Sequence, residues 1–248
     1  MSDISRIEFS NVCKYHKKKL ILNSINFSVQ RGEIATFLGA NGAGKTTLLS
    51  IAANLISHDK GTVTLYDNCE KNIDTITQYR KNIAFCPSRA IFDERFDIYY
   101  NIFYTALKYG LSKNVAHANT EHFIKKLDLI EYKHSHPSVL SFGYLQRFSI
   151  AKALVHKPSI IILDEPTVGL DFLAKKNLHN IMLSLKQEGK IVLLTTHDLE
   201  EAGNISDTLY IIKDGHIAHK CAGKDIASES KKLETLIEDI LKEESNAR

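Results

Sequence analysis

The chain has 248 residues, which is enough for one large domain or two small ones with a sizeable core. Its 44% hydrophobic and 25% charged residues are typical of a soluble globular protein, and a net charge of +3 is too small to indicate a nucleic-acid or membrane-surface partner by bulk electrostatics. No apolar run approaches the ~18 residues of a membrane-spanning helix, and the start lacks the hydrophobic segment of a signal peptide, so we expect a cytosolic protein without direct membrane insertion.

The amino-terminal part predicts a β-hairpin. Residues 4–9 and 21–29 alternate apolar and polar side chains, as two antiparallel strands with one solvated face do. The basic stretch at residues 14–19 is then the hairpin tip, and a solvated charge run is its default interpretation. Tyr15, within this stretch, could instead offer an aromatic face on which a nucleotide base stacks.

A glycine-rich motif follows at residues 39–46, which match the pattern G-x-x-x-x-G-K-[ST]. The apolar run at 33–38 predicts a buried strand before it, and residues 48–56 predict a helix after it. Such glycines let the backbone turn tightly and direct several N–H groups into one hollow, where a helix N-terminus adds positive charge. Lys45 would reach the β- and γ-phosphates, and the Thr46 hydroxyl would coordinate Mg²⁺. The expected nucleotide-binding residues are Gly39, Asn41, Gly42, Ala43, Gly44, Lys45, Thr46 and Thr47.

The alternative interpretation of this motif is a glycine-rich turn with a lysine nearby. The order of strand, loop and helix around it favours the phosphate-binding loop, because that is the context in which the loop works. The sequence therefore predicts a protein that binds a nucleoside triphosphate.

The middle of the chain interrupts the α/β pattern with helices. Residues 62–66 and 82–86 predict strands, and the second of these ends at Pro87. Residues 96–132 carry aromatic and aliphatic stripes at helical spacing, which are most simply core. Two helices at this place imply a small helical subdomain after the phosphate loop.

The second half returns to alternating strands and helices. A Ser/Gly turn at 140–147 opens a helix through about residue 156, and the apolar runs 160–163 and 191–194 predict parallel strands buried on both faces. Helices are expected at 173–187 and 199–204, and 208–212 with 215–219 predict a hairpin. The last predicted helix, with apolar residues from 233 to 241, has one apolar face.

Polar residues stand directly after the two buried strands, where open α/β sheets bind ligands. Asp164 could hold Mg²⁺, while Glu165 could orient or deprotonate the attacking water. The alternative is a pair of acids that cap a helix N-terminus. His197, after the neighbouring strand, could hydrogen-bond a γ-phosphate, although a lone histidine is more often structural. Asp171 by itself is expected to be the N-cap of the helix that begins near residue 172.

With these residues in order, the chain resembles the nucleotide-binding subunit of an ATP-binding cassette (ABC) transporter over almost its full length. Residues 39–47 look like the Walker A loop, 160–165 like the Walker B strand, 166–171 like the D-loop region, and 196–198 like the switch-histidine segment. The resemblance implies an α/β fold: an ABC-type P-loop ATPase core with a mixed, largely parallel sheet, an amino-terminal antiparallel β subdomain and an inserted helical subdomain. The expected division is an ATPase domain at 1–225, with helices inserted at about 88–140, and a carboxy-terminal amphipathic helix and tail at 226–248.

The resemblance also implies a dimer that binds ATP and Mg²⁺ between its subunits. Each ATP would lie between the Walker A loop of one subunit and the signature loop of the other, here residues 140–144. Glu165 would be the general base, His197 the γ-phosphate sensor and Asp171 part of the contact across the dimer. Tyr15 falls where the family places the adenine-stacking aromatic residue. Closing and reopening of the dimer, with a homodimer expected, would drive a multi-span permease docked near residues 88–130.

Two departures from the family pattern affect this implied mechanism. The signature L-S-G-G-Q is here L-S-F-G-Y, so that Ser141 and Gly143 remain, while Phe142 and Tyr144 replace glycine and glutamine. The Q-loop glutamine that should follow the strand at 83–87 is replaced by Ser88, which is too short to span the same distance. Hydrolysis is still expected because the general base and the switch histidine are present.

Within the family, the helical segment and the last helix look like subunits of small bacterial export systems of the ABC-2 type, which lie on the cytoplasmic face of the membrane through their permease. An importer ATPase and a soluble iron–sulfur assembly ATPase are alternatives, and the latter usually lacks the proline that Pro166 supplies. A cassette that binds ATP and dimerises as a regulator or scaffold, with little turnover, is the alternative from another functional class.

Overall fold

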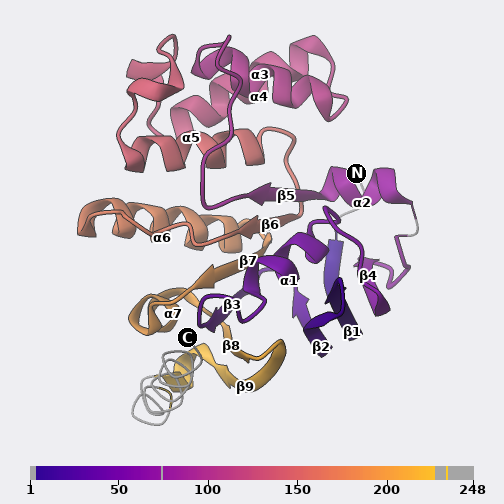
Figure 1. The fold of residues 1–248 in the computed structure, drawn as a ribbon. Coiled ribbons are helices and arrows are strands. Elements are labelled where there is room, and N and C mark those ends of the chain that lie inside the picture. The colour runs from indigo at the N-terminus through magenta and orange to yellow at the C-terminus, as the bar shows by residue number, and fades with distance from the viewer. Residues whose placement is uncertain (1–3, 74, 227–232, 234–248) are drawn as a thin grey trace.

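The computed structural model describes residues 4–73, 75–226 and 233, which form two β-sheets with helices around them (Figure 1). The strands are β1 (Ile4–His16), β2 (Lys19–Gln30), β3 (Ile34–Gly39), β4 (Lys60–Asp67), β5 (Ile83–Cys86), β6 (Ile160–Leu163), β7 (Ile191–Thr196), β8 (Thr208–Lys213) and β9 (His216–Ala222). The helices are α1 (Lys45–Ala52), α2 (Ile76–Asn82), α3 (Ile98–Lys108), α4 (Lys113–Lys126), α5 (Phe142–Leu154), α6 (Phe172–Gln187) and α7 (Leu199–Ile205). Short 3₁₀ turns occur at Ile130–Tyr132, Pro137–Val139 and Gly223–Asp225.

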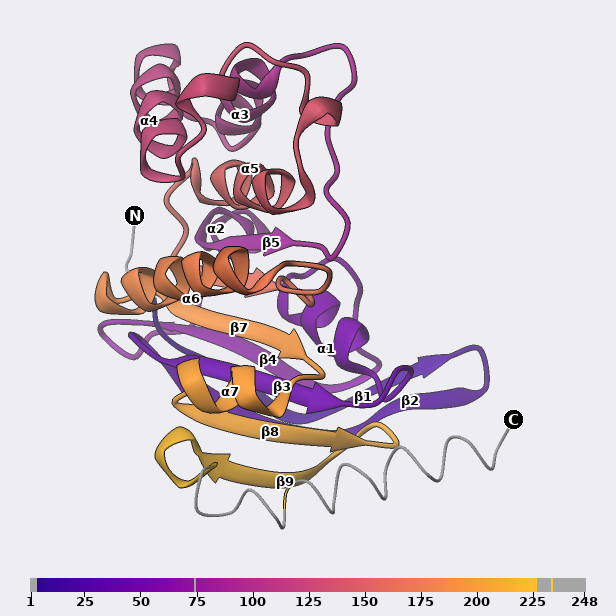
Figure 2. The same ribbon diagram turned by 90° about the vertical axis from the view of Figure 1, so that its left-hand side faces the viewer.

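The strand pairing confirms the predicted fold class. A three-stranded antiparallel sheet has the order β2-β1-β4, and a six-stranded sheet has the order β5-β6-β7-β3-β8-β9. All pairs in the larger sheet are parallel except β8 with β9. The arrowheads of β7 and β8 point to the same side of the molecule in Figure 2. The protein therefore has an α/β core in which a mixed, mostly parallel sheet is joined by an antiparallel amino-terminal sheet.

The central strands are mostly apolar because both faces of the larger sheet are covered. Successive side chains of a strand point to opposite faces, and Ile161 with Leu163 belongs to the core beside α5 and α6. Ile160 and Ile162 belong instead to the core that contains α1 and the antiparallel sheet. This two-sided burial explains why β6 and β7 read as continuous apolar runs.

Helices α3, α4 and α5 form a group at one end of the molecule, at the top of Figure 1. They follow β5 and precede β6 in the chain, as the predicted insertion requires. The apolar stripe of α3 is buried against α4 and α5, where Ile98, Ile102 and Ala106 lie in one core with Phe123 and Phe148. The proposed domain bounds, at 88 and 140 for the insertion and at 225 for the ATPase domain, stay a prediction.

Several predicted bounds were wrong. The helix after the phosphate loop begins at Lys45 and ends at Ala52, earlier than the predicted 48–56, because Asn54 takes a left-handed conformation with a φ of 52° that stops the helix. The seven-residue α2 was missed, since it shows no apolar stripe, and it takes in Asn82, which was assigned to the following strand. Strand β1 extends well beyond 4–9, because bulges near Asn11 break the alternation without ending the pairing, while β2 differs only slightly from 21–29.

The carboxy-terminal helix predicted from 233 to 241 lies outside the described residues apart from Leu233. That side chain is buried in a core with Leu209, Cys221 and Ile226. Among the helices that the structure describes, none combines the length and the apolar character that crossing a bilayer requires.

An aromatic cluster joins the two sheets. The ring of Phe37 on β3 stacks on Tyr210 of β8 with centroids 5.2 Å apart, and it meets Phe27 of β2 edge-on at 5.0 Å. Phe27 in turn stacks on Phe9 of β1 at 4.5 Å. Phe37 therefore lies at the contact between the antiparallel sheet and the strand that leads into the phosphate loop.

We expect Phe37→Ala to lower the free energy of unfolding by about 3–5 kcal/mol, because the substitution empties the centre of this cluster. Phe37→Leu should lower it by clearly less, since most of the volume is retained. Urea unfolding without nucleotide measures both values, because a bound ligand would mask the difference. Equal losses for the two variants would contradict the packing argument.

Candidate functional site

The candidate site lies at the carboxyl ends of three adjacent parallel strands. In the order β6-β7-β3, Leu163 pairs with Leu194, and Leu38 pairs with Thr196. The segments that leave these strands are the phosphate loop after β3, Asp164 and Glu165 after β6, and His197 after β7. The pairing therefore brings together three segments that are far apart in the sequence.

The phosphate loop encloses the start of α1. Gly44 is the residue before the helix and has a φ of 105°, a conformation that L side chains rarely adopt. A Cβ atom on Gly44 would meet Leu22 Cδ2 at 2.7 Å and the carbonyl oxygen of Ile21 at 3.1 Å, so a side chain there would also displace its neighbours. A Cβ on Gly39 would meet the carbonyl oxygen of Ile212 at 2.3 Å. These two glycines allow the loop to pack closely against β2 and β8.

Lys45 is buried, and its ammonium group lies inside the loop. Its Nζ donates hydrogen bonds to the carbonyl oxygens of Gly39 at 2.7 Å and Ala40 at 3.0 Å. The same Nζ lies 3.7 Å from Glu165 Oε1. The loop thus holds a cation opposite the carboxylate that follows β6.

A cavity of about 270 Å³ opens over this loop. Its lining residues are Ile21, Asn41, Gly42, Gly44, Lys45, Thr46, Thr47 and Glu165. The structure therefore brings together six of the predicted nucleotide-binding residues with the predicted base. Gly39 and Ala43 do not line the cavity: Gly39 is the last residue of β3, and Ala43 is buried in the core that contains α1.

Asp164 faces the phosphate loop and does not cap a helix. Its carboxylate accepts a hydrogen bond from Thr46 Oγ1, at 3.0 Å from Oδ2 and 3.3 Å from Oδ1. A hydroxyl and a carboxylate at this separation are the hard oxygen ligands that Mg²⁺ prefers. The donor set of Thr46 and Asp164 therefore fits the predicted metal.

Thr195 bonds both acidic residues, a role that was not predicted from the sequence. Its hydroxyl donates to Asp164 Oδ1 at 2.7 Å and accepts from the backbone N–H of Glu165 at 2.8 Å. Glu165 has a φ of 48°, a strained conformation for a residue with a side chain. A polar residue in the last positions of an otherwise apolar strand was the signal in the sequence that could have identified Thr195.

His197 follows β7 directly, and its imidazole is exposed. The strand pairing puts it one residue beyond Thr196, the partner of Leu38. Because Gly39 follows Leu38, the histidine leaves the sheet beside the point where the phosphate loop begins. Its placement at this edge agrees with the prediction, while its role as a γ-phosphate sensor stays a proposal.

The signature residues and Asp171 lie at helix N-termini. Ser141 caps α5 and accepts from the N–H of Tyr144 at 3.5 Å, and Asp171 caps α6 and accepts from the N–H of Ala174 at 2.8 Å. Within the described chain, none of residues 141–144 lines the phosphate-loop cavity. Asp171 is therefore the N-cap of α6. Within a single chain, the signature loop does not reach the phosphate-loop cavity, which it is predicted to meet in a second subunit.

The two substituted signature residues pack within their own chain. Phe142 is 47% exposed, and its ring lies so close to Gly169 that a Cβ there would meet Phe142 Cε1 at 3.4 Å. The ring of Tyr144 lies 4.7 Å from that of Tyr132. Gly143 lies close to α6, since a Cβ atom built on this glycine would be 3.4 Å from the Cβ of Ala174. The signature helix is therefore in contact with the D-loop region of the same subunit.

Tyr15 and Ser88 lie outside the cavity lining. Tyr15 is 38% exposed near the tip of the β1–β2 hairpin, where its N–H donates to Asp59 Oδ2 at 2.6 Å. Ser88 is exposed two residues beyond Cys86, which pairs with Leu163 at the same sheet edge. The position of Ser88 is that predicted for the Q-loop, and Tyr15 has the exposed ring that base stacking needs.

We expect Thr195→Val to lower the free energy of unfolding by about 1–3 kcal/mol, because the substitution leaves the N–H of Glu165 without its partner and removes the shorter hydrogen bond of Asp164 Oδ1. Thr195→Ser keeps the hydroxyl and should stay close to the parent. Denaturant unfolding of the nucleotide-free chain gives these values. If valine and serine have the same effect, the hydroxyl does not hold the acidic pair.

Comparison with known proteins identifies the family. Residues 22–168 match the ABC transporter family. The Nod factor export ATP-binding protein I of Burkholderia lata is 34% identical over 213 residues, which cover 86% of this chain and 69% of that protein. The ABC transporter ATP-binding protein NatA of Bacillus subtilis is 30% identical over 213 residues, which cover 83% of this chain and 84% of that protein. The solved structure of an ATP-binding subunit of an ABC transporter superposes with a TM-score of 0.80 at 26% identity, over 95% of this chain and 99% of that chain. The chain therefore belongs to the ABC transporter family as an ATP-binding subunit, and it is an ATPase.

Proposed function

We propose that two copies of this chain close on ATP and Mg²⁺ and, by hydrolysing the ATP, drive a separate multi-span permease in the direction of export. The observation that carries the proposal is the meeting of Lys45, Thr46 and Glu165 at one cavity, with Asp164 hydrogen-bonded to Thr46 beside it. The direction of export is supported by the relatives, since one of them is named a Nod factor export ATP-binding protein. An importer is the alternative, and it uses the same site.

The proposed chemistry follows from the charges around the cavity. The first turn of α1 offers N–H groups to phosphate oxygens, and Lys45 would exchange its two carbonyl partners for the β- and γ-phosphates. Thr46 and Asp164 would hold Mg²⁺, which neutralises phosphate charge when bound. Glu165 would take the proton of the attacking water, and His197 would hydrogen-bond the γ-phosphate from the end of β7.

The second subunit would complete the site through its signature loop. Ser141 lies at the N-terminus of α5, where a hydroxyl and N–H groups suit a γ-phosphate. Phe172, next to Asp171, is 81% exposed, which supports burial of this region against a second chain. Tyr15 would stack on the adenine. The dimer would lie on the cytoplasmic face of the membrane through its permease.

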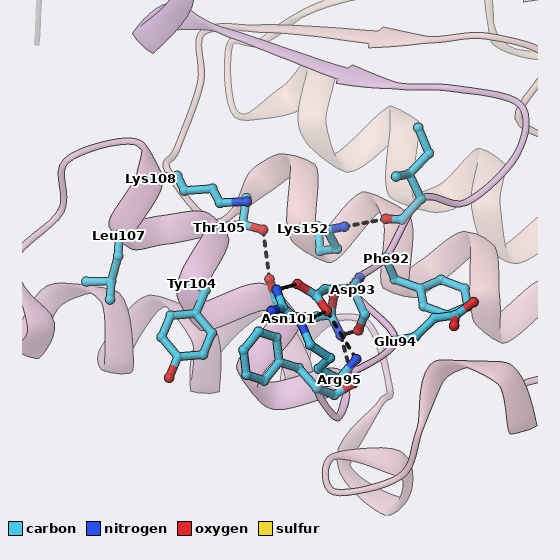
Figure 3. Close-up of a pocket in the computed structure, with 12 residues that line it drawn as sticks. Phe92, Asp93, Glu94, Arg95, Asn101, Tyr104, Thr105, Leu107, Lys108 and Lys152 are labelled. Carbon is cyan, nitrogen blue, oxygen red and sulfur yellow. Dashed lines mark hydrogen bonds and ion pairs between the residues drawn. The ribbon is translucent and has the colours of Figure 1, made fainter.

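A groove of about 870 Å³ beside α3 is the proposed docking site for the permease (Figure 3). The loop at residues 91–96, which lines this groove, is held in shape because the side-chain amide of Asn101 donates to the carbonyl oxygens of Asp93 and Phe96 at 3.1 and 2.9 Å. Arg95 pairs with Asp93 at 2.6 Å, and this guanidinium keeps the pKa of the Asp93 carboxyl well below its usual range. Lys108 lines this groove and also a second one of about 540 Å³ that includes Leu55.

We expect Glu165→Gln to lower steady-state ATP turnover about a hundredfold or more, because the amide cannot accept the proton of water. ATP binding should persist, and the ATP-bound dimer should accumulate in light-scattering measurements. Lys45→Ala is the matched control, which should lose ATP binding as well as turnover. Equal and slow turnover of the parent and the Glu165 variant, with and without the permease, would instead support the regulatory cassette.

That second candidate function has specific observations in its favour. Ser88 replaces the Q-loop glutamine, and Phe142 and Tyr144 pack inside their own subunit. These features favour unusual coupling or a slow rate. The presence of Glu165 and His197, the proposed base and γ-phosphate sensor, favours the hydrolytic motor.

We expect Ile91→Asp to reduce recovery of the permease with the tagged chain from solubilised membranes about tenfold. Ile91 is apolar, 70% exposed and part of the groove beside α3, so a charge there would be buried on docking. Val115→Asp, an exposed site on α4 outside both grooves, is the matched control and should leave recovery unchanged. Unchanged recovery with Ile91→Asp would mean that docking lies elsewhere, and equal loss for both variants would mean that the loss is not specific to this groove.

A further inference from the structure

Glu201 is a buried acid outside the proposed catalytic residues. It belongs to the first turn of α7 and is only 3% exposed. Its carboxylate has three polar partners from three different segments. Oε2 accepts hydrogen bonds from Thr196 Oγ1 at 2.6 Å and Thr167 Oγ1 at 2.8 Å, and Oε1 lies 3.0 Å from His179 Nε2 on α6.

These partners account for a charge at a buried position. Burial alone would raise the pKa of the Glu201 carboxyl, but the hydrogen bonds from His179, Thr196 and Thr167 lower it below its ordinary value. The carboxylate holds these neighbours together, because loss of His179 would leave Oε1 without a partner and loss of either threonine hydroxyl would leave Oε2 with one donor in place of two.

Two of the partners stand next to the proposed catalytic residues. Thr167 comes two residues after Glu165, and Thr196 comes directly before His197. One carboxylate oxygen therefore ties the segment that carries the proposed base to the segment that carries the proposed γ-phosphate sensor.

The other side of His197 is fixed by the same network. The N–H of Asp198 donates to Thr196 Oγ1 at 3.1 Å, and the N–H of Glu201 donates to Asp198 Oδ1 at 3.0 Å. Lys175 of α6 pairs with Asp198 Oδ2 at 3.2 Å. The backbone of the exposed histidine is thus held on both sides by residues that the Glu201 network anchors.

We propose that Glu201 is a positioning residue, whose carboxylate fixes the Glu165 segment and the His197 segment relative to each other. Since Thr167 lies in the D-loop region, the same contact transmits a shift of residues 166–171 to the histidine. The inference rests on the proposed roles of Glu165 and His197 in ATP hydrolysis. It assigns no contact between Glu201 and the nucleotide.

The test compares Glu201→Gln with the parent, using steady-state ATP turnover, the Kd for ATP and the melting temperature without nucleotide. The amide keeps the size of the side chain but cannot accept at both of its terminal atoms. We expect kcat to fall about tenfold, as a small misplacement of catalytic groups does, while the Kd for ATP changes less than about twofold. Glu188→Gln is the matched control, since it removes an exposed carboxylate paired with Lys126 and should leave both values at the parent level.

A second pair of variants keeps the test decisive if Glu201→Gln does not fold. Thr167→Val removes only the hydroxyl, and it should lower kcat in the same way, while Thr167→Ser should restore it. In the double variant with Glu201→Gln, the valine should add little further loss, because both substitutions break the same contact.

Three outcomes would overturn the inference. These are parental turnover in Glu201→Gln, equal effects of valine and serine at position 167, or a joint loss of stability, ATP affinity and turnover, which indicates a purely structural acid. Glu165→Gln, measured alongside, separates this from a failure of the proposed function. If that variant is slow while Glu201→Gln is not, only the role of Glu201 is wrong; if it turns over at the parental rate, the role of Glu165 is wrong.

Discussion

The site depends on the parallel pairing of β6, β7 and β3. The loop after each strand contributes one part of the site: two acids, a histidine and a phosphate cradle. Because side chains alternate between the faces of a strand, a slip of one residue in either pair would exchange side chains between the two cores and move each loop along the sheet edge. At the end of β7, the hydroxyls of Thr195 and Thr196 donate hydrogen bonds to Asp164 and Glu201, so the strand pairing also sets the positions of these side chains.

The burial of the sheet on both faces allows the strain at its edge. Glu165 is held at a φ of 48°, and Lys45 is buried against two backbone carbonyls, neither of which is a low-energy arrangement in isolation. Such features persist only where the surrounding structure determines them. Here the packed cores on the two faces of the larger sheet hold the backbone in place. The hydroxyl of Thr195 accepts the hydrogen bond of the Glu165 N–H, so this strained residue keeps a backbone partner.

The signature and D-loop regions are linked inside one subunit before any partner is present. Phe142 lies on Gly169, and Thr167 bonds Glu201. Phe142, which departs from the family motif, thus packs on a segment whose Thr167 shares the carboxylate of Glu201 with Thr196 of β7. In the proposed dimer, movement of either region would reach the base and the histidine through these contacts.

The family, the phosphate loop, the two acids and the succession of the strands along the chain could be predicted from the sequence, since each is encoded in a short run of residues. The apolar runs of β6 and β7 and the glycines of the loop are local signals that tertiary context does not change. Short α2 and the bulged continuation of β1 escaped prediction, because a bulge or a seven-residue helix leaves no periodic pattern. The contacts of Thr195 with the two acids were visible only in the folded structure. The same is true of Glu201, which bonds Thr167, 34 positions away in the sequence, and Thr196, 5 positions away. Such contacts form where separate strands end side by side, so their partners cannot be identified from any one stretch of chain.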